Sequence, residues 1–143
     1  MSFVTNRKCI GCNKSLLTRS QLKYCSQQCQ ATTKYYKSIE EWKFGIKNGS
    51  LGIQTRIISS FLRRYLFEKY KNKCSQCGWN EKNLVSGKIP LEVDHIDGNS
   101  ENNSEENLRL LCPNCHSLTP YFRNLNKGKG RRWRMKNIQK RIN

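Results

Sequence analysis

The chain has 143 residues, of which 36% are hydrophobic, and its 27 Lys and Arg outnumber its 10 Asp and Glu, which gives a formal net charge of +17. No stretch approaches the ~18 apolar residues of a membrane span, and the N-terminal segment lacks the apolar core of a secretory signal. We therefore expect a cytoplasmic protein of one domain or two very small ones, with nucleic acid as its partner. Basic charge alone would equally fit a ribosomal protein or a membrane-surface binder.

Four of the eight cysteines lie in residues 1–36, as Cys9-x2-Cys12 followed by Cys25-x3-Cys29. Two close pairs separated by twelve residues can surround one tetrahedral zinc ion. In a reducing compartment this spacing favours metal binding over disulfides. We expect a four-cysteine zinc finger that loosely resembles zinc-ribbon and treble-clef fingers. Such a finger reads DNA, binds a partner or only stabilises the chain, and the sequence leaves these roles open.

Residues 37–70 are predicted to be a helical connector. Its first helix is expected to begin at a capping box formed by Ser38 and Glu41, with Ile39, Trp42 and Ile46 on one face. The glycine-containing stretch that follows should end this helix.

A second amphipathic helix is expected over residues 54–70. Its apolar stripe is typical of core packing, and Arg63 and Arg64 lie largely off that stripe. The basic side is either only solvated or also contacts DNA phosphates, and the two interpretations are compatible.

Residues 71–126 are predicted to be a compact α+β unit. Residues 91–96 alternate apolar and polar side chains as a half-buried strand does, and residues 108–111 form a second short strand. A helix is expected from the last cysteine pair to about Leu125. The spacing Cys74-x2-Cys77 and Cys112-x2-Cys115 indicates a structural zinc site, because four thiolates leave no open position for catalysis.

Acidic residues are concentrated around the first of these strands. Six of the ten acids fall within residues 92–106, a stretch without Lys or Arg. Carboxylates repel DNA phosphates, so this cluster makes sense if a cation lies between them. Both histidines of the chain, His95 and His116, adjoin these features. Asp94 and His116 are plausible ligands of Mg²⁺ or Mn²⁺. A histidine beside a cysteine cluster is often a zinc ligand instead, but here four cysteines already complete that site.

The run from Val93 to Asn99, followed by the run from Glu106 to His116, resembles the signature of the HNH endonucleases. The H, N and H of that signature match His95, Asn107 and His116. The resemblance covers about residues 54–130 and is strongest to small phage-encoded and homing-type members. A phage-encoded protein would act in the cytoplasm of its bacterial host.

The resemblance implies a ββα-metal fold around one catalytic cation. It makes Asp94 and His116 the metal ligands, His95 the general base, and Asn107 the residue that holds the loop and orients His95. Hydrolysis of DNA would then leave 5′-phosphate and 3′-hydroxyl ends. We expect a monomer or weak dimer.

Residues 127–143 are predicted to be a basic tail that binds DNA phosphates or only increases solubility. The expected DNA contacts there and just before it are Arg123, Lys127, Lys129, Arg131, Arg132 and Arg134. Two alternatives stay open: a zinc-finger DNA-binding regulator without catalysis, and an RNA-processing nuclease. The regulator does not account for the acidic cluster or for the Asp94–His95 pair.

Overall fold

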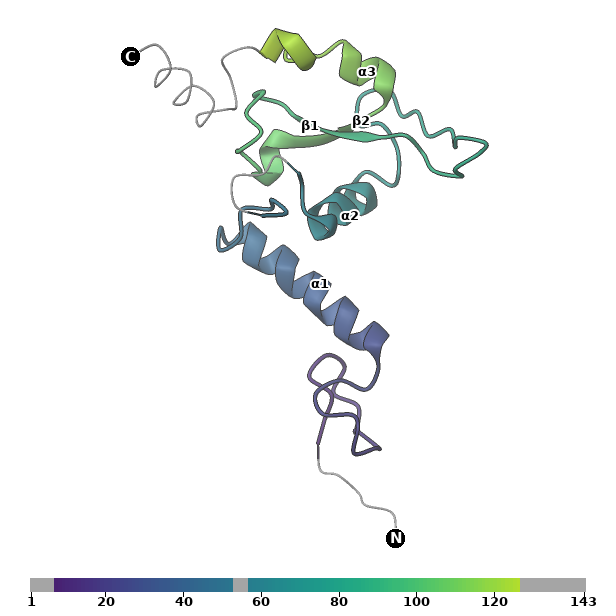
Figure 1. Ribbon diagram of the computed structural model, residues 1–143, viewed down its shortest axis with the longest axis vertical. Helices are drawn as coiled ribbons and strands as arrows, with labels where there is room; N and C mark the ends of the chain where they lie inside the picture. The colour runs from purple at the N-terminus through teal and green to yellow at the C-terminus, as the bar shows by residue number, and fades with distance from the viewer. Residues whose placement is uncertain (1–6, 53–56, 127–143) are drawn as a thin grey trace.

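The computed structural model describes residues 7–52 and 57–126. A two-stranded sheet lies between helices α2 and α3, and α1 extends from this unit toward the loops of the first cysteine cluster (Figure 1). The elements, in chain order, are α1 (Gln27–Lys43), α2 (Ser60–Lys69), β1 (Glu92–His95), η1 (Glu105–Asn107), β2 (Leu108–Leu111), α3 (Pro113–Ser117) and η2 (Arg123–Asn126). Within the described ranges, no helix is long and apolar enough to cross a membrane.

The two strands confirm the predicted pair, and their register determines on which face of the sheet each side chain of the site lies. They are antiparallel, and their register pairs Glu92 with Leu111, Val93 with Leu110, Asp94 with Arg109, and His95 with Leu108. Successive side chains of a strand point to opposite faces, and directly opposed residues share a face. Asp94 and Arg109 therefore lie on the face that α3 covers, whereas His95 and Leu108 lie on the face that α2 covers.

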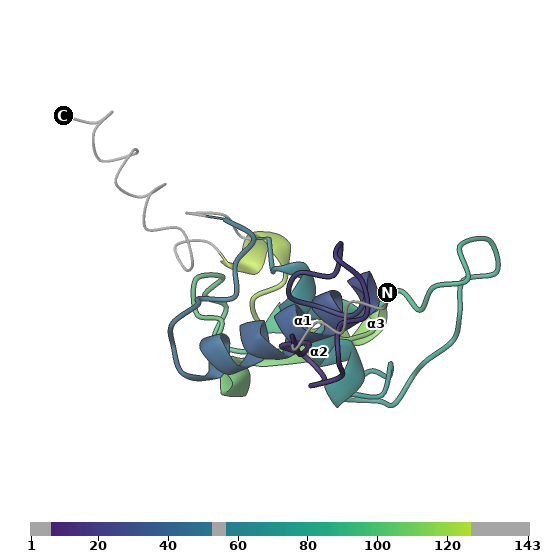
Figure 2. The ribbon, with the colours of Figure 1, turned by 90° about the horizontal axis from the view of Figure 1, so that it is seen from below.

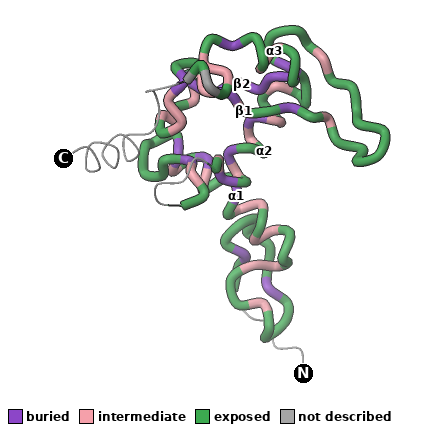
Figure 3. Tube along the Cα trace, turned by 45° about the horizontal axis from the view of Figure 1, so that its top comes forward, coloured by how far each residue is buried: buried purple, intermediate pink, exposed green. Residues whose placement is uncertain are grey.

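The core lies between α2 and the sheet. Leu62 and Leu66 of α2 are completely buried, and they pack with Trp42 of α1 and Leu108 of β2. The tube view shows that burial concentrates around the sheet and the helices that flank it, while the segment between α2 and β1 is largely exposed (Figure 3). Trp42 also donates its indole N–H to the carbonyl of Asn103 at 2.8 Å, which fixes α1 against the loop between the strands.

Helix α1 starts eleven residues before the predicted capping box, so that prediction was wrong. Ser26 caps the helix by accepting a hydrogen bond from the amide of Cys29, and Ser38 lies inside the helix. Tyr35, Ile39 and Trp42 are buried on one face, so the apolar spacing simply continues upstream. The helix passes through residue 36, where we had expected the finger to end.

Helix α1 ends at Lys43, before the glycine-containing stretch as predicted, and this leaves Ile46 outside the helix and 73% exposed. The prediction that Ile46 shares a helical face with Ile39 and Trp42 was therefore wrong.

The other two predicted helices are shorter than expected. Helix α2 begins at Ser60, because Ile58 pairs as an isolated bridge with Ser50; residues 54–56 of the predicted helix lie outside the described residues. Helix α3 ends at Ser117, well before residue 125. Pro120 follows closely, and proline lacks the amide that a continuing helix needs and disfavours helical geometry in the residue before it.

We predict that Leu66→Ala destabilises the protein by about 2–5 kcal/mol, because it leaves a cavity in a fully buried position. Urea unfolding of the zinc-loaded chain, followed by tryptophan fluorescence, measures this change. Leu84 is completely exposed, so Leu84→Ala is the matched control and should change the free energy of unfolding by less than ~0.5 kcal/mol. Equal effects of the two substitutions would contradict this description of the core.

Candidate active site

Asp94 and His116 come together on the α3 face of the sheet. Asp94 is buried in β1, and His116 lies in α3 directly after Cys115. The Oδ1 atom of Asp94 is 3.7 Å from Nε2 of His116, so the two potential ligand atoms face each other without a direct hydrogen bond. The sequence predicted that these two residues share one site, and in the structure their side chains lie side by side.

Two further side chains hold this pair, and neither had a role predicted from the sequence. Glu92 points to the same face as Asp94, two residues along β1, and its Oε2 is 2.6 Å from Nδ1 of His116. Arg109, opposite Asp94 on β2, donates its Nε–H to Oδ2 of Asp94 at 2.7 Å. Glu92 contacts Nδ1 of His116 and Arg109 contacts Oδ2 of Asp94, the two atoms that do not face the other member of the pair. Oδ1 of Asp94 and Nε2 of His116 are thereby left facing each other.

His95 bonds to the loop that connects the strands. Its Nε2 is 2.8 Å from Oδ1 of Asn103, and the amide nitrogen of Asn103 donates to Oγ of Ser50 at 3.0 Å. An amide oxygen only accepts hydrogen bonds, so Nε2–H of His95 is the donor in this contact. The proton of neutral His95 is therefore on Nε2, and the lone pair is on Nδ1. Asn103 is 5% exposed, so the contact is shielded from water.

Asn107 holds the loop but makes its contacts with residues other than His95. Its side-chain oxygen accepts from the amide of Asp97 at 2.9 Å, and its side-chain nitrogen donates to Oδ1 of Asp97 and to the carbonyl of Asn102. Burial acts against ionisation of Asp97, but hydrogen bonds from Asn102, Asn99 and Asn107 outweigh it and lower the pKa of its carboxyl group. The direct contact to His95 comes from a different asparagine than the expected one.

The acidic cluster serves more than one purpose. Glu105 pairs with Lys69 at 2.9 Å and Lys43 at 3.3 Å, and it accepts a hydrogen bond from Tyr65. Burial opposes its ionisation, but these partners lower the pKa of Glu105 to about 2. Glu105 is thus paired with lysines and Asp97 is bonded within the loop, so only part of the acidic cluster lies near His116.

Both predicted cysteine clusters assemble. Burial of Cys74 opposes ionisation, but hydrogen bonds from the backbone amides of Cys112, Cys77 and Gln76 outweigh it and lower the pKa of the thiol to about 6. Four sulfur ligands with one thiol biased toward thiolate suit a closed zinc site. Within each cluster the sulfur atoms lie within 4.8 Å of one another; the clusters are Cys9, Cys12, Cys25 and Cys29, and Cys74, Cys77, Cys112 and Cys115.

The basic residues proposed to contact DNA are partly engaged inside the protein. Arg63 donates to the carbonyl of Leu91 at 3.1 Å, and Arg64 pairs with Glu68 at 2.7 Å. Arg123 is exposed and lies over the ring of Phe122. The remaining predicted contacts, Lys127, Lys129, Arg131, Arg132 and Arg134, lie outside the described residues.

Residues 74–119 match the family model of the HNH endonucleases, a range that includes the second cysteine cluster, both strands and α3. The H-N-H endonuclease F-TflIV of Escherichia phage T5 is 39% identical over 98 residues, which are 66% of this chain and 38% of the phage protein. The chain therefore spans little more than a third of that relative's length. No solved structure matches the chain. The resemblance found in the sequence is confirmed over this core.

We predict that chelator-washed protein retains two zinc ions per chain, one for each four-cysteine cluster. Cys112→Ser should unfold the unit around the sheet, because a structural zinc site supplies folding energy directly. Cys9→Ser removes a ligand of the other cluster and should leave that unit folded. Elemental analysis and thermal melting followed by circular dichroism report both effects. Retention of one zinc or none by the unsubstituted protein would contradict the assignment.

Proposed function

We propose that this chain is a metal-dependent DNA endonuclease, because residues 74–119 match the HNH endonuclease family model. In this proposal β1, β2 and α3 form the ββα-metal unit, and hydrolysis leaves 5′-phosphate and 3′-hydroxyl ends. The observation that carries it is the Asp94–His116 pair, whose atoms face each other at 3.7 Å while Arg109 and Glu92 occupy their other atoms. The net charge of +17 supports DNA as the substrate.

The facing atoms of Asp94 and His116 fit a catalytic divalent cation. One carboxylate oxygen and one imidazole nitrogen are donors that Mg²⁺, Mn²⁺ and related ions accept, and two protein ligands leave positions for water and phosphate. When bound, such a cation stabilises negative charge on the phosphate and on the leaving 3′ oxygen. Glu92 accepts a hydrogen bond from Nδ1–H of His116, which keeps Nε2 unprotonated and raises its basicity toward a ligand.

His95 acts as the general base in this proposal. Asn103 holds the proton on Nε2, which leaves Nδ1 to accept a proton from the attacking water. Asn107 and Asp97 hold the loop that carries Asn103, so their contribution to the rate is through position. The proposed base His95 and the proposed ligand Asp94 are adjacent residues at the end of β1.

We predict that His95→Ala slows cleavage by roughly 10²–10⁴-fold, the usual contribution of a general base. A neutral imidazole adds little affinity beside so many cations, so the variant should bind DNA almost as tightly as the original protein. Plasmid nicking and linearisation with Mg²⁺ or Mn²⁺ measure the rate, and anisotropy with a labelled duplex measures binding. Full cleavage by the variant would refute the assignment of the base. A wild-type protein that binds DNA but cuts none would favour the non-catalytic regulator.

We predict that Glu92→Gln raises the Mn²⁺ concentration for half-maximal cleavage by about 10-fold or more, because a neutral amide supports the basicity of His116 less than a carboxylate does. Titration of cleavage with Mn²⁺ gives this value, and excess metal should restore much of the rate. Glu106 is an exposed acid of the same cluster, so Glu106→Gln is the control for a change of local charge. Identical metal dependence of the two variants would remove Glu92 from the site.

A further inference from the structure

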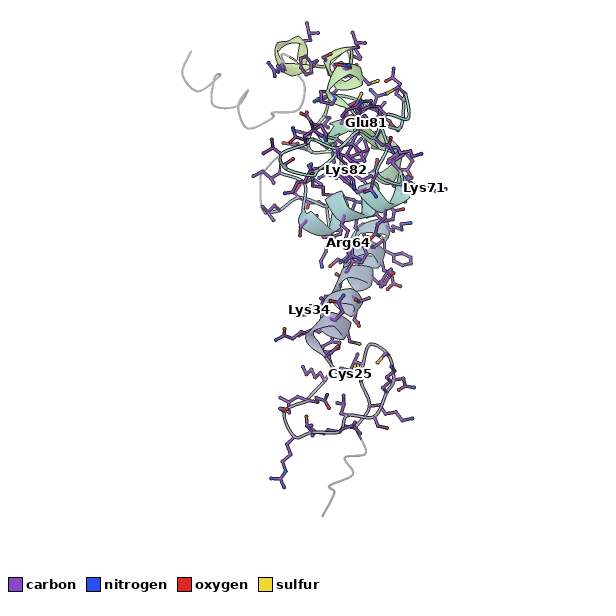
Figure 4. All side chains as sticks on the ribbon, turned by 90° about the vertical axis from the view of Figure 1, so that its right-hand side faces the viewer. Cys25, Lys34, Arg64, Lys71, Glu81 and Lys82 are labelled. Carbon is purple, nitrogen blue, oxygen red and sulfur yellow. The ribbon has the colours of Figure 1, made fainter. Side chains whose placement is uncertain are left out.

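A basic pocket lies away from the Asp94–His116 pair, between α2 and the segment that leads to β1. Its volume is about 570 Å³, and α2 contributes Arg63 and Arg64 while the segment contributes Lys82 and Lys88. None of the residues that line it is acidic. Viewed from the side toward which the segment projects, Lys82 lies over α2 and above Arg64 (Figure 4).

The segment over residues 80–90 stands away from the rest of the molecule in two perpendicular views (Figures 1 and 2). Its tip carries two aliphatic side chains in adjacent positions, Leu84 and Val85, which are 100% and 97% exposed. Nothing in the described chain covers them. Lys82 and Lys88 flank them on both sides.

The tip is an ordered turn. The side-chain oxygen of Asn83 accepts hydrogen bonds from the amides of Val85 and Ser86 at 3.0 and 2.8 Å. The backbone of Asn83 exchanges two further bonds, donating to Lys88 and accepting from Gly87, whose φ of +64° suits glycine. These bonds present the aliphatic pair outward in one conformation, so little conformational entropy is lost when the tip meets a partner.

The base of the segment is attached to the catalytic strand. Arg63 donates to the carbonyl of Leu91, the residue directly before Glu92, and Glu92 contacts His116. A partner held by the pocket and the tip is therefore positioned relative to the proposed catalytic pair through a few covalent and hydrogen bonds.

We propose that the basic pocket and the tip of residues 80–90 form a docking element for duplex DNA, separate from the catalytic residues. The pocket binds backbone phosphates, and Leu84 and Val85 enter the minor groove. The lining residues include no acid, although Arg64 pairs with Glu68, and such a group of cations suits the phosphate backbone. Aliphatic side chains flanked by basic ones suit the minor groove, where apolar side chains insert between base steps. A concave pocket favours DNA over a flat anionic membrane. This inference rests on the proposed function, because it takes DNA as the substrate.

The test measures binding of a labelled 30-bp duplex by full-length, zinc-loaded protein in a His95→Ala background, from 50 to 200 mM KCl. Lys82→Ala/Lys88→Ala should weaken binding and reduce the slope of log K against log salt by about 2, because about 0.9 counterions are released per phosphate contact. Lys34→Ala/Lys37→Ala removes the same charge from exposed positions of α1 and is the matched control. An equal change of slope in both double variants would mean that the pocket contributes only non-specific charge, and this result would overturn the proposal.

Leu84→Ser/Val85→Ser should weaken duplex binding several-fold at every salt concentration without changing the slope. A minor-groove ligand such as netropsin should compete with the parent protein and lose its effect on this variant. The control is Leu17→Ser/Leu22→Ser, a pair that is 79% and 70% exposed elsewhere. All these positions are exposed, so melting temperatures should be unchanged.

Three further outcomes would overturn the inference. The first is duplex affinity of the tip variant equal to that of the parent. The second is binding to phosphatidylserine vesicles that the tip variant alone loses while its DNA binding is intact, which would assign the tip to a membrane. The third is netropsin competition that persists in the tip variant. Plasmid cleavage by the protein with His95 intact is measured in parallel, so failure of the docking element is separable from failure of the nuclease.

Discussion

The second four-cysteine cluster is the constraint on which the rest of the site depends. It joins the turn at Cys74 and Cys77 to the turn at Cys112 and Cys115, two segments more than thirty residues apart in sequence. His116 follows Cys115 directly, so the sulfur cluster also fixes where that imidazole can lie. Without it, a five-residue helix next to a two-stranded sheet has too little buried area to stay in place. A metal bound by these four cysteines would therefore hold His116 in place beside the strands.

The pleat of β1 then separates two environments within four residues. One face carries Glu92 and Asp94 toward α3, where Arg109 and His116 complete a charged group. The other face carries Val93 toward the apolar core and His95 toward the loop. A ligand set needs fixed charge, whereas a general base needs a neutral imidazole in a defined tautomer. The proposed ligand Asp94 and the proposed base His95 are adjacent residues of this strand, and they have different surroundings because successive side chains alternate.

The sequence predicted the parts of this protein that depend on spacing. Both cysteine clusters, the two strands and the Asp94–His116 pair followed from patterns that leave few geometric choices. The ends of helices were less predictable: a capping box at Ser38 was plausible locally, but the buried stripe of α1 continued upstream to Tyr35 and the helix followed it.

The contacts of Glu92 and Asn103 were missed for another reason. The first depends on the register of β1 against α3, and the second on how a polar loop folds back toward Ser50. Neither contact corresponds to a recognisable motif in the sequence. An asparagine-rich loop offers several equivalent candidates, and only its three-dimensional path distinguishes Asn103 from Asn107.

Helix α1 connects the first cysteine cluster to the loop between the strands. It carries Cys29 of the first cluster near its start and Trp42, bonded to Asn103, near its end. Gly11 packs so closely on α1 that a methyl group there would come within 2.1 Å of Thr33, so the turn of the finger lies directly on the helix. Seventeen helical residues span about 26 Å, which equals the rise of about eight base pairs. The helix therefore holds the first cysteine cluster at a fixed offset from the loop between the strands.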